Sequence, residues 1–372
     1  MVMSLVLPRR RFLATAAGGF AAGVLGKSRI VSAVDESAIE WHDVQEWGVE
    51  GKGFADTEKF YDRLPARAKG VVRDAVWGLS RHSAGMMTRF KTDATEIWTE
   101  HTVTSPKLEM SHMPATGVSG LDLYAEDEAR APRWVSVMKP TGPTTKGAIV
   151  SGLAAGERVY SVYLPLYNGT ESVKIGVPSG ASFTPIAPRT DKPLVFYGTS
   201  ITHGACASRP GMPHPAILGR RLNRPVINLG FSGNGKMEAE VTALLTELDA
   251  AVYIIDCLPN MVGSEVAERT EPLVRTLRAA RPETPILLVE DRTYANTWIM
   301  PSKQTRHAES RAALRAAYER LIAEGVTGLS YLPGEALLGE DRDDTTDGSH
   351  PSDLGFQRQA DAIEPLLRKA LG

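Results

Sequence analysis

Cysteine is nearly absent from this sequence: its 372 residues include two, Cys206 and Cys257. Two cysteines exclude a disulfide framework and a zinc site with four cysteine ligands. A single bridge between them is one interpretation. Two inert buried thiols are the favoured interpretation, because cysteine is commonly a small core residue.

A surplus of charge of either sign is also lacking. The 42 Lys and Arg residues nearly balance the 44 Asp and Glu residues, which gives a formal net charge of -2. Proteins that bind nucleic acid neutralise many phosphates and need a basic face, so nucleic acid is not expected as a partner. Beyond residue 33 there is no apolar run near the roughly 20 residues that a membrane span requires. We therefore expect no membrane partner for the mature chain.

The N-terminal segment differs from the rest of the chain. Arg9-Arg10-Arg11-Phe12-Leu13 precedes an apolar stretch over 14–26, and Val31-Ser32-Ala33 is a small-residue cleavage site. These are the parts of a secretory signal, and the paired arginines before Phe-Leu resemble a twin-arginine export signal. A retained membrane anchor is the alternative, but the stretch is short and glycine-rich. We expect residues 1–33 to be a signal peptide, and the protein to be exported to the periplasm or secreted.

Residues 34–190 contain short β-like runs separated by Pro, Gly, Thr and Ser. The clearest runs are 134–138, 147–150, 158–163 and 172–177. This texture is typical of a β-sandwich domain. One helix is expected ahead of these runs, over 57–80, where turn residues become fewer.

Residues 191–372 alternate between apolar strands and amphipathic helices. The expected strands are 193–197, 225–229, 250–256, 285–290 and 328–332. The expected helices are 214–222, 236–248, 264–280, 308–323 and a last one from about 352. Such alternation predicts an α/β fold with a doubly wound, parallel, five-stranded sheet. Ligand sites in such sheets lie at the carboxyl ends of the strands, which tests any proposed site.

A candidate nucleophile follows the first of these strands. Ser200 stands in Gly198-Thr199-Ser200, and glycines on both sides permit a tight turn that exposes it. A serine hydroxyl needs a base within hydrogen-bond reach. His350 and Asp347, three residues apart in a polar loop before the last helix, supply a base and a carboxylate that orients it. Taken singly, Ser200 also fits a turn or cap residue, and Asp347 with His350 fits an exposed loop.

Two further features follow the second and third strands. Gly233 lies in a glycine-rich turn whose backbone N–H groups are free to point at a ligand, and Asn260 can donate from its side chain. An acyl-transfer site needs donors aimed at the oxyanion of the tetrahedral intermediate. Plain turn chemistry for Gly233 and a cap for Asn260 are the alternatives. Their position at the correct ends of the strands favours the catalytic interpretation.

An acidic run precedes the histidine, formed by Asp341, Asp343, Asp344 and Asp347. Its spacing lacks the glycine that follows the third ligand of an EF-hand calcium loop. We interpret most of the run as solvated surface. Neither a metal nor an organic cofactor is expected.

The set as a whole resembles the SGNH (GDSL-like) hydrolases. Ser200, Gly233, Asn260, Asp347 and His350 occur in the order that defines this family, over about the last 180 residues. The resemblance implies the flavodoxin-like SGNH fold and the catalytic triad Ser200, Asp347 and His350. It also implies an oxyanion hole formed by the N–H of Ser200, the N–H of Gly233 and the side chain of Asn260.

One position departs from the usual Gly-Asp-Ser block, since Thr199 replaces the aspartate, as it does in some branches. The front domain resembles the β-rich partner domain of one SGNH branch. The matching segments are Gly120-Leu121-Asp122-Leu123-Tyr124, Tyr163-Leu164-Pro165-Leu166-Tyr167-Asn168 and Glu290-Asp291-Arg292-Thr293-Tyr294-Ala295-Asn296. Asp291 and Arg292 are candidates for binding a polar group of the substrate. Tyr124 is a weaker candidate, since aromatic residues of this kind more often seat one domain on another.

These features predict an exported serine esterase that acts on short-chain carboxylic esters through an acyl-Ser200 intermediate. Analogy to the branch implies O-acetyl groups on a carbohydrate as the substrate. A lipid or general carboxylester substrate is the main alternative, and an exposed apolar lid would favour it. Acyl transfer to an acceptor other than water uses the same residues. A catalytically inactive carbohydrate-binding protein is the alternative outside enzymes. The oligomeric state is not predicted.

Overall fold

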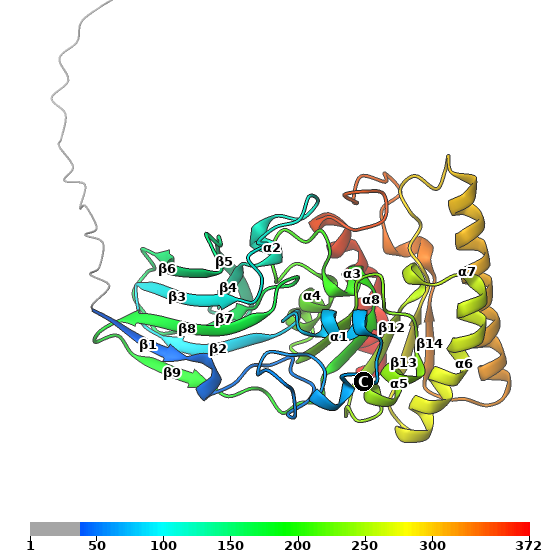
Figure 1. Ribbon diagram of the computed structural model, residues 1–372, viewed down its shortest axis with the longest axis horizontal. Helices are drawn as coiled ribbons and strands as arrows, with labels where there is room; N and C mark the ends of the chain where they lie inside the picture. The colour runs from blue at the N-terminus through cyan, green and yellow to red at the C-terminus, as the bar shows by residue number, and fades with distance from the viewer. Residues whose placement is uncertain (1–37) are drawn as a thin grey trace, which may run out of the picture. The chain divides into compact units, whose positions relative to one another are not determined.

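Two antiparallel sheets form the first part of the computed structural model, which describes residues 38–372. The first sheet has the order β1 (Ile39–Asp43), β8 (Thr170–Pro178), β3 (Glu96–Val103) and β6 (Thr144–Ser151). The second has the order β5 (Pro132–Met138), β4 (Leu121–Glu126), β7 (Arg158–Tyr163), β2 (Met87–Thr92) and β9 (Phe183–Ile186). These sheets appear on the blue-to-green side of Figure 1.

Alternation along the strands gives the two sheets a shared core. On β7, Tyr160 and Val162 are buried while Val159 and Ser161 are only half-buried. Tyr160 and Val162 pack in one cluster with residues of the facing sheet such as Ile97. A period of two is what a sheet with one buried face requires. The predicted β-sandwich is confirmed.

The second part contains a parallel sheet with the order β11-β10-β12-β13-β14. Its strands are β10 (Leu194–Gly198), β11 (Val226–Gly230), β12 (Val252–Asp256), β13 (Ile286–Val289) and β14 (Leu329–Leu332). The chain order 2-1-3-4-5 is that of flavodoxin-like sheets, whose topological switch point lies between the first and third strands. The predicted doubly wound, five-stranded sheet is confirmed.

Helices cover both faces of this sheet (Figure 1). One face is covered by α5 (Ala239–Leu245), α6 (Gly263–Ala280) and α7 (Pro301–Ala323). The other is covered by α3 (Ser200–His203), α4 (His214–Arg221) and α8 (Asp353–Leu371). Successive residues of β10 serve opposite faces: Tyr197 packs with the first group and Phe196 with the second.

The helix predicted over 57–80 is largely wrong. The structure has the 3-10 helix η3 (Ala66–Ala68) and the short helix α1 (Asp74–Ser80) there, with turns before them. Pro65 precedes η3, and Gly70 has a φ of +74°, which an α-helix does not contain. Proline and glycine therefore divide a segment whose other residues favour a helix.

Most of this segment packs on the parallel sheet, whereas Phe60 and Tyr61 pack in the core of the sandwich. Phe54, Leu64, Val72 and Val76 belong to the same core cluster as Tyr197 of β10. The predicted boundary between 190 and 191 therefore separates the sheets, but it does not separate the hydrophobic cores. Residues Glu36–Gly372 form one compact unit.

The shorter elements are η2 (Val44–Glu46), α2 (Ala115–Val118), η4 (Leu258–Asn260) and η5 (Gly334–Leu337). Within residues 38–372, the helices are either too short or too polar to cross a bilayer. The export signal predicted over 1–33 lies outside the described residues.

Candidate active site

Ser200 begins helix α3 directly after β10. A Cβ at Gly198 would lie 2.1 Å from Oγ1 of Thr202, so this turn requires glycine. Thr199 is the N-cap, and its Oγ1 accepts a hydrogen bond from the N–H of Ile201 at 3.2 Å. Thr199 therefore has a local structural role at the position where the family usually has aspartate. Gly204, with a φ of +115°, ends the helix after one turn.

The structure brings Ser200, His350 and Asp347 into one hydrogen-bonded chain. Ser200 Oγ lies 2.8 Å from His350 Nε2, and His350 Nδ1 lies 2.7 Å from Asp347 Oδ2. If Nδ1 carries the proton and donates it to the carboxylate, Nε2 is free to accept the serine proton. These distances are within the range expected of a nucleophile, its base and the group that orients the base.

Asp347 is held in its ionised form by the backbone of its own loop. Its Oδ1 accepts hydrogen bonds from the N–H groups of Ser349 at 3.0 Å and His350 at 2.8 Å. Burial raises the pKa of Asp347, but the hydrogen bonds from His350 and Ser349 outweigh burial and lower this pKa to about 2. The carboxylate is therefore available to stabilise a protonated His350 at any ordinary pH.

The predicted oxyanion donors follow the neighbouring strands. Ser200 is the first residue of α3, where a backbone N–H has no acceptor within its helix. Gly233, in the turn after β11, has a φ of +69° and open space where a side chain would stand. Asn260 ends η4, which follows β12. The three residues thus follow adjacent strands at the carboxyl edge of the sheet, next to its switch point.

The two possible orientations of the Asn260 amide differ in the hydrogen bonds that its oxygen and nitrogen can form. In one, Nδ2 lies 3.3 Å from the carbonyl oxygen of Phe231, and the amide oxygen faces only acceptors. In the other, the amide oxygen accepts from the N–H groups of Asn234 at 3.0 Å and Gly235 at 3.1 Å. We assign the second, because the NH2 group then faces acceptors.

A buried aromatic group lies behind the nucleophile. Tyr167 donates a hydrogen bond from its hydroxyl to the carbonyl oxygen of Ser200 at 3.1 Å, and its ring stacks on His203 at 4.1 Å. His203 Nε2 lies 2.7 Å from the carbonyl oxygen of Leu166, and burial holds the pKa of His203 well below its ordinary value. A neutral, buried His203 is a packing residue and not a base. The sequence indicated Tyr167 through its matching segment, but it did not reveal this contact with the helix of the nucleophile.

Asp291 and Arg292 are not placed to bind substrate. Both are 0% exposed. Arg292 Nη2 donates to both carboxylate oxygens of Asp256, at 2.7 and 3.0 Å, and Thr202 of α3 donates to the same carboxylate at 3.3 Å. The expectation that this pair binds a polar substrate group is therefore wrong. Arg292 instead holds Asp256, the last residue of β12, in contact with the helix that begins at Ser200.

Tyr124 is also remote from the substrate, since it is 4% exposed and contacts Arg209. Asp122 on the same strand accepts hydrogen bonds from Arg209 at 2.9 Å, from the N–H of Gly211 at 2.8 Å and from Trp134 at 3.0 Å. Arg209 and Gly211 belong to the loop between α3 and α4. The Gly-x-Asp-Leu-Tyr segment therefore binds the sandwich to the loop between α3 and α4, in agreement with the interpretation that it forms an interface between the two parts.

Other residues singled out in the sequence are buried. His214, at the start of α4, is 0% exposed and packs between Phe196 and Phe356. Cys206 and Cys257 are free and buried, and burial raises the pKa of both thiols. Among residues 38–372, the His, Cys, Asp and Glu side chains nowhere group in a way that could hold a metal ion.

The loop after β13 is bound to the loop that carries His350, and it contains exposed residues that the sequence did not indicate. The N–H of Ala295 donates to the carbonyl oxygen of Gly348 at 2.8 Å, which fixes the loop after β13 against the loop of the catalytic histidine. Further along this loop Trp298 and Ile299 are 65% and 61% exposed. Exposed apolar residues on this loop are the kind of feature that favours the lipid alternative. His112, from the sandwich part, lies 6.1 Å from the ring of His350.

Two family models together match most of the chain. The model of the GDSL-like lipase/acylhydrolase family matches residues 191–368, and the model for the N-terminus of SGNH-hydrolase-type esterases, named GxDLY, matches residues 39–183. A solved structure from Bacteroides ovatus, assigned as a GDSL-like lipase, is 33% identical to this chain. The match covers 90% of this chain and 98% of that one, with a TM-score of 0.85. The chain belongs to the GDSL-like lipase/acylhydrolase family.

More distant structures share the fold of this GDSL-like protein. The salicylyl-acyltransferase SsfX3 of a tetracycline biosynthetic pathway is 18% identical over 89% of this chain and 97% of its own, with a TM-score of 0.72. The acetyl xylan esterase Est2A of the rumen bacterium Butyrivibrio proteoclasticus is 11% identical over 90% and 99%, with a TM-score of 0.55. No curated protein sequence matches this chain significantly.

Proposed function

We propose that this GDSL-like protein is a serine esterase that removes short acyl groups, in particular O-acetyl groups of carbohydrates. The observation that carries the proposal is the hydrogen-bonded chain from Ser200 Oγ through His350 to Asp347, at 2.8 and 2.7 Å. It lies at the carboxyl ends of the parallel strands, where sites in such sheets occur.

Acylation begins when Ser200 Oγ attacks the ester carbonyl carbon and its proton moves to His350 Nε2. The negative charge on the former carbonyl oxygen is stabilised by the N–H groups of Ser200 and Gly233 and by Asn260. One such donor contributes about 3 kcal/mol to the stability of the transition state. Asp347 stabilises the protonated His350. The tetrahedral intermediate then collapses, and His350 gives its proton to the leaving alcohol.

Deacylation repeats these steps with water as the nucleophile. His350 Nε2 accepts a proton from water as the water oxygen attacks the acyl carbon, and the same donors hold the oxyanion. Collapse of the second intermediate returns the proton to Ser200 Oγ and releases the carboxylic acid. Every proton transfer in the cycle uses His350 Nε2, which the structure holds against Ser200.

Support for a carbohydrate substrate comes from the solved structures with this fold, which include the acetyl xylan esterase. A rim tryptophan is consistent with this class, because a sugar ring stacks well on an aromatic face. A second candidate is a lipid or other ester with a long acyl chain. The exposed residues Trp298, Ile299 and Met300 favour it, because together they give the rim an apolar surface.

The experiment is hydrolysis of p-nitrophenyl acetate, butyrate and octanoate by the chain without residues 1–33, with Ser200→Ala as the control. We expect p-nitrophenol release from acetate that falls with chain length and is lost in Ser200→Ala. A preference for octanoate would support the second candidate. An activity that persists in Ser200→Ala, or no turnover of any ester, would contradict the esterase proposal. Product analysis in the presence of added alcohols separates hydrolysis from acyl transfer.

Export remains a proposal that rests on the sequence of residues 1–33. Fractionation of cells that express the full chain, compared with a variant in which Arg9, Arg10 and Arg11 are replaced by Lys, tests it. We expect the protein outside the cytoplasm only with the native arginines. Equal distribution of the two forms would contradict a twin-arginine signal.

A further inference from the structure

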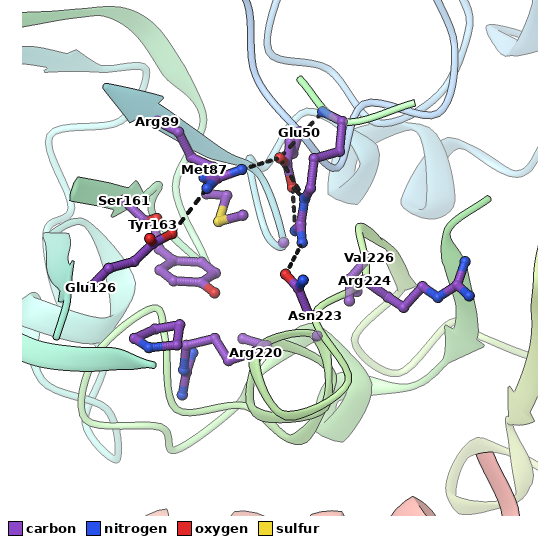
Figure 2. Close-up of a pocket in the computed structure, with 15 residues that line it drawn as sticks. Glu50, Met87, Arg89, Glu126, Ser161, Tyr163, Arg220, Asn223, Arg224 and Val226 are labelled. Carbon is purple, nitrogen blue, oxygen red and sulfur yellow. Dashed lines mark hydrogen bonds and ion pairs between the residues drawn. The ribbon is translucent and has the colours of Figure 1, made fainter. Parts of the chain in front are cut away.

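A second polar pocket lies at the opposite edge of the parallel sheet from Ser200. Its lining includes Met87 of β2, Tyr163 of β7, Arg220 of α4 and Val226, the first residue of β11. Ser200, Gly233 and Asn260 follow the carboxyl ends of their strands, whereas Val226 is at the amino end of β11. The two ends of β11, which has five residues, are about 17 Å apart. The pocket is therefore separate from the catalytic site and lies where the sandwich meets α4 (Figure 2).

The pocket is small inside and opens into a larger groove. The inner space measures about 50 Å³, which is room for a few water molecules or one small oxyanion. The adjoining groove measures about 1,050 Å³ and shares part of its lining with the inner pocket. Six arginines line the groove, against one acidic residue, Glu126: Arg89, Arg130, Arg133, Arg189, Arg220 and Arg221.

The acidic residues of this region are already paired with other arginines. Glu50 accepts hydrogen bonds from Arg189 Nε and Nη2, the shortest at 2.6 Å, and Glu126 accepts from Arg89 at 3.1 Å (Figure 2). Asp122, on the neighbouring strand β4, is bound to Arg209. These carboxylates therefore leave the remaining positive charge of the pocket uncompensated.

Arg220 and Arg224 carry that charge, and Figure 2 shows the Arg224 side chain directed away from Arg220. The positive charge inside the pocket is therefore that of Arg220. Within residues 38–372, Nη1 of its guanidinium is shielded from solvent and has no hydrogen-bond partner. The guanidinium also forms a side-chain hydrogen bond with Tyr163. It packs over the ring of Tyr124 at 4.3 Å and over that of Tyr163 at 5.5 Å. Aromatic faces stabilise a cation but satisfy none of its N–H donors. A half-buried guanidinium whose Nη1 has no hydrogen-bond partner, in a cavity of this size, has the properties of an anion-binding group.

We propose that this pocket binds one oxyanion, a carboxylate or a phosphate, held by the guanidinium of Arg220. The planar fork of arginine matches both groups with two parallel hydrogen bonds. The wider arginine-lined groove has room for the molecule that carries the anion, such as an acidic sugar. The pocket would then recognise a charged ligand at a site other than the one where the ester is cleaved.

Isothermal titration calorimetry at low ionic strength tests the proposal with inorganic phosphate, D-glucuronate and D-glucose as ligands. We expect phosphate or glucuronate to bind the native chain without glucose binding, and the stronger of the two anions identifies the source of the oxyanion. Arg220→Gln should weaken binding at least tenfold. Arg320→Gln on α7, which removes the same charge on the opposite face of the sheet, should leave binding unchanged.

A second variant keeps Arg220 in place, because its replacement also removes packing against two tyrosines. Ser161 lines the same pocket, so Ser161→Asp supplies a carboxylate to it. We expect this variant to lose anion binding at least tenfold and to unfold at a higher temperature. If neither anion binds the native chain, or if Arg220→Gln or Ser161→Asp binds as tightly as the native chain, the proposal is wrong.

Two comparisons keep this proposal distinct from the esterase proposal. Ser200→Ala should bind the anion as tightly as the native chain, since the pocket contains no catalytic residue. Arg220→Gln should hydrolyse p-nitrophenyl acetate within about twofold of the native rate. Loss of anion binding in Ser200→Ala would show that the anion binds at the catalytic site, and would overturn the proposal of a separate pocket.

Discussion

At the scale of single residues, the role proposed for Asp347 is one that other hydrogen-bonding side chains cannot perform. Its two oxygens orient His350 from both sides, one bound to the ring Nδ1 and the other to the backbone N–H of the same residue. Asparagine has nearly the same shape, but its NH2 group favours the wrong tautomer of the imidazole. The carboxylate charge is also lost.

Asp347→Asn should therefore lower kcat by about 10³-fold to 10⁴-fold with the fold unchanged. Steady-state hydrolysis of p-nitrophenyl acetate measures this loss, and far-UV circular dichroism checks the fold. Since the pKa of Asp347 is about 2, we also expect no acidic limb of the pH–rate profile to come from this carboxylate. A decrease of less than tenfold in kcat would exclude Asp347 as the orienting residue.

Asp291 is the residue whose charge should make stability depend on pH. Burial raises the pKa of Asp291 from 3.8 to about 6, although Arg292 and Arg306 oppose the shift. Between these two pH values the folded chain binds a proton that the unfolded chain has released, so stability falls as pH rises through this window. The full effect is up to about 3 kcal/mol.

Asparagine cannot ionise, so Asp291→Asn should lack this contribution. From pH 4 to pH 7, the free energy of unfolding of the native chain should therefore fall by up to about 3 kcal/mol relative to that of the variant. Urea unfolding at several pH values measures it, and the comparison cancels the titration of other groups. A difference that does not change with pH would show that the buried carboxylate has an ordinary pKa.

At the scale of elements, the loop after β13 connects the rim of the site to its catalytic histidine. Ala295 is bound to Gly348, and the same loop exposes Trp298 and Ile299. An apolar side chain that is more than half exposed beside a catalytic loop contributes little to folding. It is free to contact a bound ester.

Trp298→Ala should lower kcat/KM for p-nitrophenyl octanoate more than for the acetate, by about tenfold, because burying a large side chain against an acyl chain contributes about 1.5 kcal/mol. Val71→Ala is the matched control, since Val71 is 61% exposed on the segment before α1. Equal effects of Trp298→Ala on both esters would show that the rim does not contact the acyl chain.

The sequence was sufficient for the elements that local chemistry determines. The five parallel strands, the sandwich and the positions of Ser200 and His350 follow from periodicity, turn residues and ordered motifs. The prediction of one helix over 57–80 was wrong because Pro65 and Gly70 override the helix-forming residues around them. The burial of Asp291 and Arg292 could not be predicted, because it depends on Asp256, a residue more than thirty positions earlier that pairs with Arg292 only in the folded chain.

At the scale of the whole molecule, the parallel sheet depends on residues that lie between β1 and β2, the first two strands of the sandwich. Phe54, Leu64, Val72 and Val76 pack in the core cluster of the parallel sheet. Arg63 is fully buried and donates to the carbonyl oxygens of Asn228 at 3.0 Å and Gly230 at 2.8 Å, at the end of the strand that leads to the Gly233 turn. The segment from 54 to 76 thus supports both the core of the parallel sheet and the end of the strand that leads to Gly233.

A chain reduced to residues 191–372 should therefore fail to fold, although it contains the triad and all five parallel strands. Losing the four apolar side chains of the 54–76 segment removes about 6–12 kcal/mol of burial, which is comparable with the entire stability of a typical domain at about 5–15 kcal/mol. Near-UV circular dichroism and turnover of p-nitrophenyl acetate test this, with residues 36–372 as the control. That longer chain should unfold in a single cooperative transition, because one core contains both the segment from 54 to 76 and the parallel sheet. A soluble, active 191–372 fragment would show that the parallel sheet is a self-sufficient domain and that the segment from 54 to 76 only covers it.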